Sequence, residues 1–256
     1  MIPDLSPGAD LPLLFLDPGA WGEGHVRLSE AQWHYLARVL RLPAGSPFRV
    51  LDGLGTRWMA RMPTPDERSR EAVISDPQPA PGELPGRITL VQAILKGDRQ
   101  DWILQKATEL GVHAIVPVLT ERTVVRLEAD RADRRMARWQ EIIREAAEQC
   151  ERGRLPILLP PVRLTDSLPG ELAATEALWF GHPREAGIPS LKEAVRATTG
   201  ADHRFFVGPE GGFSPAEEAW LRGRGVRPVS LGARILRAET ACLAAVSLLA
   251  SELEER

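Results

Sequence analysis

The sequence is poor in cysteine and in long apolar runs, and each shortage removes a class of protein. Its 256 residues include two cysteines, Cys150 and Cys242, too few for a disulfide framework or a cysteine-based zinc site. No apolar run approaches the roughly 20 residues that a membrane-spanning helix needs. The stretch MIPDLSPGAD has neither the basic nor the apolar region of a signal peptide. We therefore expect a cytoplasmic protein without a membrane segment.

Lysine is also scarce. Only Lys96, Lys106 and Lys192 are lysine among the 32 basic residues. A positive surface would therefore consist of arginine, whose forked guanidinium suits phosphate groups. The net charge of -3 gives no global basic field that would indicate nucleic acid, but it leaves room for a local basic patch. The five histidines are scattered without ligand spacing, so no metal is predicted.

The chain divides by pattern into two parts. Residues 1–76 hold short strand-like segments and one helix, which predicts a small β-barrel domain. Residues 77–86 contain four prolines, which we expect to stay out of any sheet and to form a semi-rigid linker. Residues 87–256 alternate strands and helices, which predicts an α/β domain with a mostly parallel sheet covered on both faces.

Local signals place the individual elements. Capping boxes at Ser29–Gln32 and Ser190–Glu193 each begin a helix, and Ser214 with Glu217 begins a third. We expect Asp98 to cap a helix whose buried face includes Trp102, and a long charged helix at about 131–150. A final helix is expected at about 239–252. Strands are expected at 13–16, 48–51, 58–60, 71–75, 88–95, 114–119, 157–159, 177–180, 205–207 and 228–231.

Two glycine-bearing loops follow the last two of these strands. The first, Gly208–Pro215, has three glycines that let backbone approach a ligand closely. It is neither GxGxxG nor a P-loop, since no lysine follows to meet phosphates, so a dinucleotide or triphosphate is disfavoured. An ordinary strand-to-helix turn is the competing interpretation.

The second loop, Leu231–Ala241, places two arginines and an acid where a strand ends, which is where open α/β sheets bind ligands. Ile235 and Leu236 are unusual in a solvated loop and indicate an apolar slot for a flat ring. Alternatively, Glu239 and Thr240 merely begin a helix, and Arg237 pairs with a carboxylate.

Together, VGPEGGFSPAE and LGARILRAETA resemble the second and third motifs of the SPOUT methyltransferases. The match is closest to the ribosomal RNA small subunit methyltransferase E family, and the resemblance covers most of the chain. Further segments similar to that family are Leu95–Asp98, Gln105–Gly111, Glu121–Val125, Glu145–Cys150, Arg154–Pro156, His34–Leu42 and Asp52–Gly53.

The resemblance implies a PUA-like RNA-binding domain over residues 1–76, followed by a homodimeric α/β domain with a trefoil knot. It implies S-adenosylmethionine as cofactor and 16S ribosomal RNA, in the small ribosomal subunit, as partner. The implied reaction is methylation of N3 of a specific uridine.

The resemblance also implies the residues that bind the cofactor. Glycine backbone would contact its methionine or ribose part, and Leu231, Ile235 and Leu236 would enclose adenine. The full set is Leu119, Phe180, Gly181, Val207, Gly208, Pro209, Gly211, Gly212, Leu231, Gly232, Ile235, Leu236, Arg237, Thr240 and Ala241.

For catalysis we expect Arg237 to stabilise the uracil anion or to hold the adjacent phosphate, with Glu239 orienting it. The general base stays unassigned between Glu210 and Glu239. Many family members begin with an arginine-rich strand, whereas residues 11–15 here are neutral. RNA contact therefore falls to Arg27, Arg38 and Arg41. Cys150 stands where a small hydroxyl residue is common, and no role is assigned to it.

Two other functions compete with this one. A ribose 2′-O-methyltransferase of the same superfamily would usually carry an Asn and Arg pair in its first motif, which Leu119–Arg122 lacks. A non-catalytic RNA-binding protein that retains the cofactor pocket is the second. The intact Gly208–Gly212 and Arg237–Thr240 segments argue against it.

Overall fold

A computed structural model describes residues 11–63, 70–124, 129–166, 177–182 and 185–256. The chain forms two compact units. The first comprises Met1–Glu83 together with Ala147–Leu155, and the second comprises Leu84–Ala146 together with Pro156–Arg256.

The first unit is built on a five-stranded sheet with the strand order β1-β3-β4-β5-β2. Its strands are β1 (Leu13–Phe15), β2 (His25–Arg27), β3 (Pro47–Leu51), β4 (Thr56–Arg61) and β5 (Glu71–Pro79). Its helical segments are η1 (Pro18–Ala20), α1 (Glu30–His34) and the π-helix η2 (Tyr35–Val39). The Asp52–Gly53 signal is confirmed, because β3 and β4 pair antiparallel around it and Gly53 has φ +72°. Ser29 and Gln32 form the expected capping box.

The expectation that the prolines keep residues 77–86 out of the sheet is wrong for residues 77–79, because β5 includes Pro77 and Pro79, whereas residues 80–86 lie in no strand. Pro79 lies opposite Thr56 of β4. β2 pairs with β5 only at residues 71–73, so the later part of β5 has a sheet neighbour on one side alone. A proline without an N–H is tolerated on such an edge. The pairing of β4 with β5 shifts register between Arg57 and Met59.

Residues 147–155 belong to the first unit through specific polar contacts. Glu148 Oε1 accepts from the Phe15 N–H at 2.9 Å. Glu151, which follows Cys150, forms an ion pair with Arg49 at 2.6 Å. The hydrogen bond from Arg49 lowers the pKa of the Glu151 carboxyl below its ordinary value. The acid beside Cys150 therefore has a structural role within this unit.

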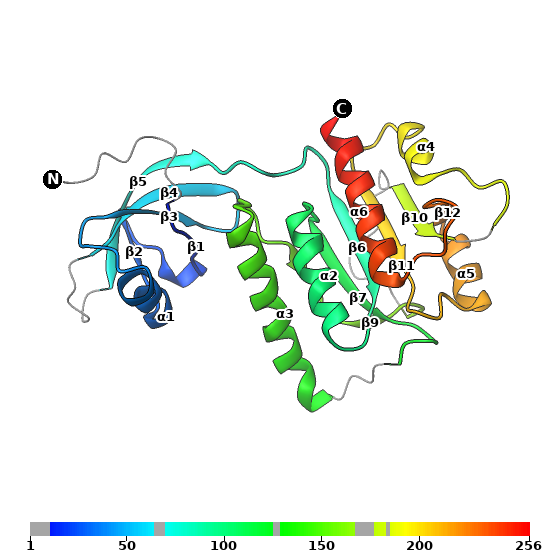
Figure 1. Cartoon of the computed structure of the whole chain (residues 1–256), viewed down its shortest axis with the longest axis horizontal. Helices are drawn as coiled ribbons and strands as arrows, with labels where there is room; N and C mark the ends of the chain where they lie inside the picture. The colour runs from blue at the N-terminus through cyan, green and yellow to red at the C-terminus, as the bar shows by residue number, and fades with distance from the viewer. Residues whose placement is uncertain (1–10, 64–69, 125–128, 167–176, 183–184) are drawn as a thin grey trace. The chain divides into compact units, whose positions relative to one another are not determined.

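The second unit is an α/β fold on a seven-stranded sheet in which every described pair of strands is parallel (Figure 1). The order is β12-β10-β11-β6-β7-β8, and β9 also pairs with β7. The strands are β6 (Ile88–Ala93), β7 (Ala114–Leu119), β8 (Ile157–Leu158), β9 (Val162–Arg163), β10 (Ala177–Gly181), β11 (His203–Val207) and β12 (Arg227–Val229). The helices are α2 (Asp98–Glu109), α3 (Ala129–Gln149, whose last three residues belong to the first unit), α4 (Leu191–Arg196), α5 (Pro215–Arg222) and α6 (Ala238–Glu254).

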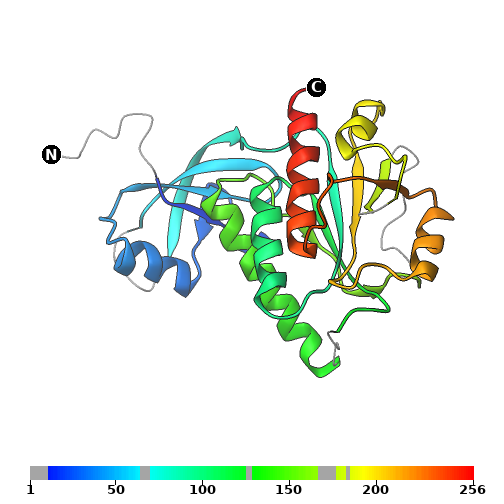
Figure 2. The ribbon, with the colours of Figure 1, turned by 45° about the vertical axis from the view of Figure 1, so that its right-hand side comes forward.

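Alternate residues of the central strands enter two separate cores. Leu90 and Phe205 pack on the face covered by α2, α4 and α6. Val91 and Phe206 pack on the opposite face with Leu221 of α5. Figure 2 shows α2 and α6 beside each other over their face of the sheet. Burial on both faces confirms the expected covered parallel sheet, and it explains why these strands read as continuous apolar runs.

Two details of α2 differ from expectation. The helix is capped by Gly97 at φ +66° without a side-chain hydrogen bond, and Asp98 is its first residue. Ile103 and Ala107 are buried as expected, but Trp102 is 43% exposed, one position around the helix from Ile103. Hydrophobic spacing predicts an apolar stripe along the helix. It does not show whether a residue at the edge of that stripe packs against the rest of the chain or faces solvent.

Among the described helices, none has both the length and the apolar character that crossing a lipid bilayer requires.

His203 gives the fold a pH dependence that can be measured. It is fully buried, and its Nδ1 accepts from Trp179 Nε1 at 3.2 Å. Burial lowers the pKa of His203 from 6.5 to about 4, and the charge of Arg256 adds to this while Asp202 opposes it. A folded pKa below the unfolded one means that the unfolded chain binds the proton more readily. Stability present above pH 6.5 should therefore be lost as the pH falls toward 4.

We expect the free energy of unfolding, measured with urea at a series of pH values, to fall by roughly 2–3 kcal/mol between pH 6.5 and 4.5. His203→Gln keeps a polar side chain without this titration and should flatten that part of the curve. Equal slopes for the wild type and the variant would contradict the assignment.

Candidate functional site

Three neighbouring strands bring the predicted site residues to one edge of the sheet. β10 pairs with β11 and with β12, and Phe180 lies level with both Phe206 and Pro228. Gly181, the last residue of β10, lies level with Val229. The loops that follow β10, β11 and β12 therefore begin side by side. This carboxyl edge is where open α/β sheets bind ligands.

The glycine loop, Gly208–Phe213, offers backbone rather than side chains. A Cβ on Gly208 would lie 3.1 Å from the Phe213 nitrogen and 3.2 Å from the Gly212 carbonyl carbon, so the loop folds tightly on itself. Gly212 has φ +68°, a conformation that residues with a Cβ rarely adopt. Gly211 and Gly212 are exposed. The loop's own geometry thus requires glycine at Gly208 and Gly212, and the Gly212 N–H donates to the Pro209 carbonyl at 2.9 Å.

Side chains from three other elements hold the glycine loop. Arg99 of α2 donates to Glu210 at 2.7 Å. Arg122, between β7 and α3, donates to the carbonyls of Gly211 and Phe213. Glu217 completes the expected capping box with Ser214 and also accepts from the Glu121 N–H. Sequence reasoning missed these roles for Arg99 and Arg122, and it saw in Glu217 only a helix cap.

The second loop combines an exposed apolar residue with unpartnered polar groups. Gly232 has φ +111°, and its N–H donates to Ser230 Oγ at 3.1 Å. Ile235 is 62% exposed. Arg237 is the exposed N-cap residue of α6; its carbonyl accepts from the Ala241 N–H, and its guanidinium makes no hydrogen bond or ion pair within the described part of the chain. Glu239, in the first turn of α6, has a buried Oε2 without a hydrogen-bond partner there.

The remaining predicted cofactor residues divide by exposure. Phe180 and Val207 are buried in the cores, and Pro209 is buried as well, so a ligand would reach mainly their backbone. Leu119, Gly181, Leu231, Leu236 and Ala241 are half-buried, and Thr240 is exposed. No hydrogen bond joins Arg237 to Glu239 in the structure as described, so the proposed orienting contact stays a prediction.

The predicted RNA-contacting arginines all lie in the first unit. Arg27, on β2, is exposed. Arg38 is exposed and sits 5.7 Å from the Trp33 ring centroid. Arg41 follows η2 with φ +55°, an uncommon backbone conformation for a residue with a side chain. All three side chains are exposed.

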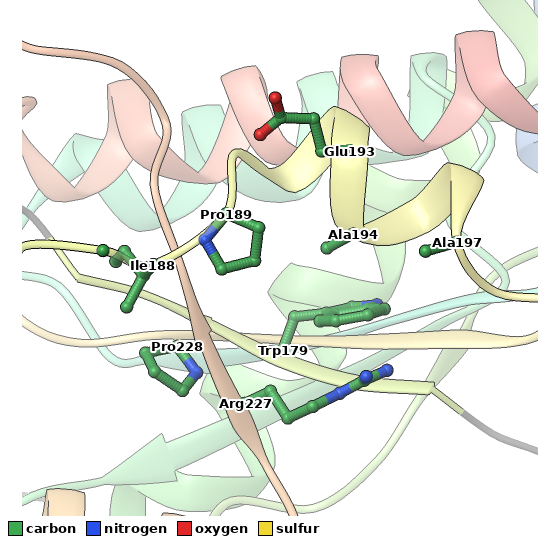
Figure 3. Close-up of a pocket in the computed structure, with 9 residues that line it drawn as sticks. Trp179, Ile188, Pro189, Glu193, Ala194, Ala197, Arg227 and Pro228 are labelled. Atoms are coloured by element: carbon green, nitrogen blue, oxygen red, sulfur yellow. The ribbon is translucent and has the colours of Figure 1, made fainter.

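A separate cavity of about 520 Å³ lies against the outermost strand of the sheet (Figure 3). Trp179, Arg227 and Pro228 line one side, and Pro189 and residues of α4 line the other. The Arg227 guanidinium lies 4.2 Å from the Trp179 ring centroid. None of the predicted cofactor residues lines this cavity, so we do not place the site there.

The chemistry of the described residues favours neither a metal nor a thiol mechanism. They contain no group of three His, Cys, Asp or Glu side chains arranged to hold a metal ion. Cys242 lies in α6 two residues after Thr240, but burial raises the pKa of its thiol, so the thiol stays protonated. Cys150 donates from Sγ to the Ala147 carbonyl at 3.8 Å.

Known proteins are similar to this chain over most of its length. The family model described as an RNA methyltransferase domain matches residues 82–250. A ribosomal RNA small subunit methyltransferase E from Synechocystis sp. is 37% identical over 233 residues, which cover 91% of this chain and 75% of that relative.

Two solved structures are similar over nearly the full chain. A ribosomal RNA small subunit methyltransferase E from Neisseria gonorrhoeae, bound to S-adenosyl methionine, is 34% identical with a TM-score of 0.82, covering 94% of this chain and 98% of that chain. A putative methyltransferase from Legionella pneumophila, in complex with the bound cofactor SAM, is 30% identical with a TM-score of 0.82. That match covers 95% of this chain and 98% of that chain.

Proposed function

We propose a function from one premise: the chain belongs to the ribosomal RNA small subunit methyltransferase E family. It is an S-adenosylmethionine-dependent methyltransferase of ribosomal RNA. Its acceptor is N3 of a specific uridine in the 16S ribosomal RNA of the small subunit. The observation that carries the proposal is that two loops bearing the family's motifs leave the same carboxyl edge of the parallel sheet, one on each side of β10.

The residues at this edge fit S-adenosylmethionine. The compound carries amino groups, which donate hydrogen bonds, and a flat adenine ring. The unpartnered Glu239 Oε2 is an acceptor for such a donor. Backbone is exposed at Gly211 and Gly212, although the Gly211 carbonyl and the Gly212 N–H already have partners within the chain, and Ile235 with Leu236 suits adenine. The full cofactor set inferred from the resemblance remains our proposal for the binding residues.

When bound, the cofactor supplies a methyl group on a positively charged sulfur. The chain must then position the uracil ring in line with that group and lower the cost of removing the N3 proton. The Arg237 side chain is exposed without a partner among the described residues, so its guanidinium can stabilise negative charge on the uracil or hold the adjacent phosphate.

Of the two candidate bases, we favour Glu239 over Glu210. An ion pair with Arg99 at 2.7 Å engages the Glu210 carboxylate. Glu239 retains a buried oxygen without a partner among the described residues, and a buried acceptor of this kind is costly unless something donates to it. The N3–H of a bound uracil is such a donor.

Mass spectrometry of small-subunit RNA from a strain lacking this chain tests the function. We expect one uridine to lose a base methyl group and the intact chain to restore it. A lost ribose methyl group would indicate 2′-O methylation instead, and unchanged RNA would refute the proposal.

Arg237→Ala tests the catalytic assignment in purified enzyme. We expect kcat at saturating RNA and cofactor to fall about 100-fold, as when one group that stabilises transition-state charge is removed. Arg87→Ala removes an exposed arginine just before β6, at the opposite end of the sheet, and should leave kcat unchanged. Unchanged turnover in Arg237→Ala would remove the residue from the mechanism.

We propose that the first unit binds RNA through Arg27, Arg38 and Arg41. Each phosphate contact releases condensed counterions, so the logarithm of affinity should fall linearly with the logarithm of salt concentration. We expect each of the three alanine variants to reduce that slope by about 1 in fluorescence-anisotropy titrations. Variants with the wild-type slope would place the contacts elsewhere.

The finer architecture is also part of the proposal: a PUA-like barrel in the first unit, a trefoil knot in the second, and a homodimer. Support for the dimer comes from apolar side chains left partly open on α2 and α6, including Trp102, Leu243 and Leu248. Sedimentation equilibrium should give twice the chain mass, and a monomer would contradict the dimer. A crystallographic chain trace decides the knot and the barrel.

A further inference from the structure

The glycine loop is fastened to a turn from a distant part of the chain. This turn, Thr120–Thr123, directly follows β7, and it is closed by its own hydrogen bonds. The Thr123 N–H donates to the Thr120 carbonyl at 3.1 Å, and the Thr120 N–H donates to Thr123 Oγ1 at 3.0 Å. The two hydroxyls lie 2.8 Å apart. The turn is therefore a defined support and not a loose segment.

Arg122 projects from this turn onto the glycine loop. Its NH1 donates to the Gly211 carbonyl at 2.7 Å and to the Phe213 carbonyl at 3.3 Å. A Cβ on Gly211 would lie 3.2 Å from Arg122 Cδ, so the arginine stem also packs against the backbone there. One side chain thus holds two carbonyls of a loop whose glycines would otherwise leave it free to move.

Glu217, in the first turn of α5, makes the second connection between the turn and the end of the glycine loop. It is 4% exposed, and its two carboxylate oxygens accept from different backbone segments. Oε2 accepts from the Ser214 N–H at 2.8 Å, and Oε1 accepts from the Glu121 N–H at 2.7 Å. The first bond belongs to the capping box of α5. The second has no role in capping and ties the turn to the end of the glycine loop.

Another capping box in the same unit shows what capping alone requires. Glu193 of α4 accepts from the N–H and the hydroxyl of Ser190 through a single oxygen, and it remains exposed. No contact to a second segment is described for it. The burial of Glu217 and its second hydrogen bond, to the Glu121 N–H, therefore exceed what starting its helix requires.

We propose that Arg122 and Glu217 are positioning residues that pre-organise the glycine loop for the cofactor. The inference rests on the proposed function, because it assigns to these residues the affinity of the same S-adenosylmethionine site. A loop already held in its binding geometry loses less conformational entropy when the ligand arrives. Removing either connection should weaken cofactor binding while the sheet and its two cores stay intact.

Arg122→Ala is the first test. Calorimetry with S-adenosylmethionine should show a dissociation constant raised about 10-fold, as expected for the loss of one or two hydrogen bonds. KM for the cofactor should rise by a similar factor, while kcat at saturating cofactor stays within about 3-fold. Arg122→Lys can still reach one carbonyl and should recover part of the affinity.

Arg256→Ala is the matched control for Arg122. Arg256 also donates to backbone carbonyls, those of Gly200, Val195 and Thr198, but it does so around the end of α4. Its loss should lower thermal stability and leave cofactor affinity unchanged. A variant that is merely unstable reduces the active fraction, which lowers the calorimetric stoichiometry and the apparent kcat without changing the dissociation constant.

Glu217→Gln tests the second connection without changing side-chain size. An amide offers one oxygen, so it can accept from Glu121 or from Ser214 but not from both, and its NH₂ group then faces an N–H donor. We expect cofactor affinity to fall about 10-fold. Glu193→Gln makes the same chemical change in the exposed capping box and should not alter affinity.

The outcomes separate this inference from the proposed function. If the wild type neither binds S-adenosylmethionine nor methylates RNA, the proposed function fails and this inference fails with it. If the wild type binds and methylates but Arg122→Ala and Glu217→Gln keep its affinity, only the positioning role is refuted. Should Arg122→Ala not fold, Arg122→Lys decides, and wild-type affinity in that variant refutes the role of Arg122.

Discussion

The parallel pairing of β10 with both β11 and β12 is the constraint on which the candidate site depends. It places Gly181, Gly208 and Leu231 at the ends of adjacent strands, although they are separated by long stretches of chain. Burial of Phe205 and Phe206 on opposite faces fixes this register, because a shift of one residue would turn each ring toward the wrong core. The site is thus maintained by hydrophobic packing beneath it.

A backbone-lined site creates a second requirement, which polar contacts meet. Glycines let peptide groups reach a ligand, but they also make a loop costly to order. Arg99 and Arg122 offset that freedom by binding the glycine loop, and Glu217 binds Ser214 directly after it. The second loop is arranged differently, because Arg237 and Glu239 retain groups without described protein partners. One loop is held in place by other side chains, and the other keeps polar groups without described partners.

Several local features could be predicted because their causes are local. The three capping boxes at Ser29, Ser190 and Ser214 form as expected, since a cap needs only residues within one helical turn. The alternating strand and helix pattern correctly predicted a parallel α/β sheet. The predictions that were wrong depend on tertiary neighbours, which the local sequence does not specify. Pro77 and Pro79 enter a strand because one side of that strand lacks a sheet partner. Trp102 was expected to be buried and is exposed. That prediction failed because helical spacing does not reveal what covers the edge of an apolar stripe.

By itself the sequence determined the parallel α/β class, the two glycine-bearing loops and the family resemblance, because these depend on residue type and on short spacing. It also placed Glu239 at the start of a helix and Arg237 in the loop before it. Only the tertiary structure decided that Arg122 holds Gly211 and that the second oxygen of Glu217 binds Glu121. Those contacts join residues about 90 positions apart, and a hydrogen bond over such a separation exists only once the sheet has brought its strand ends together.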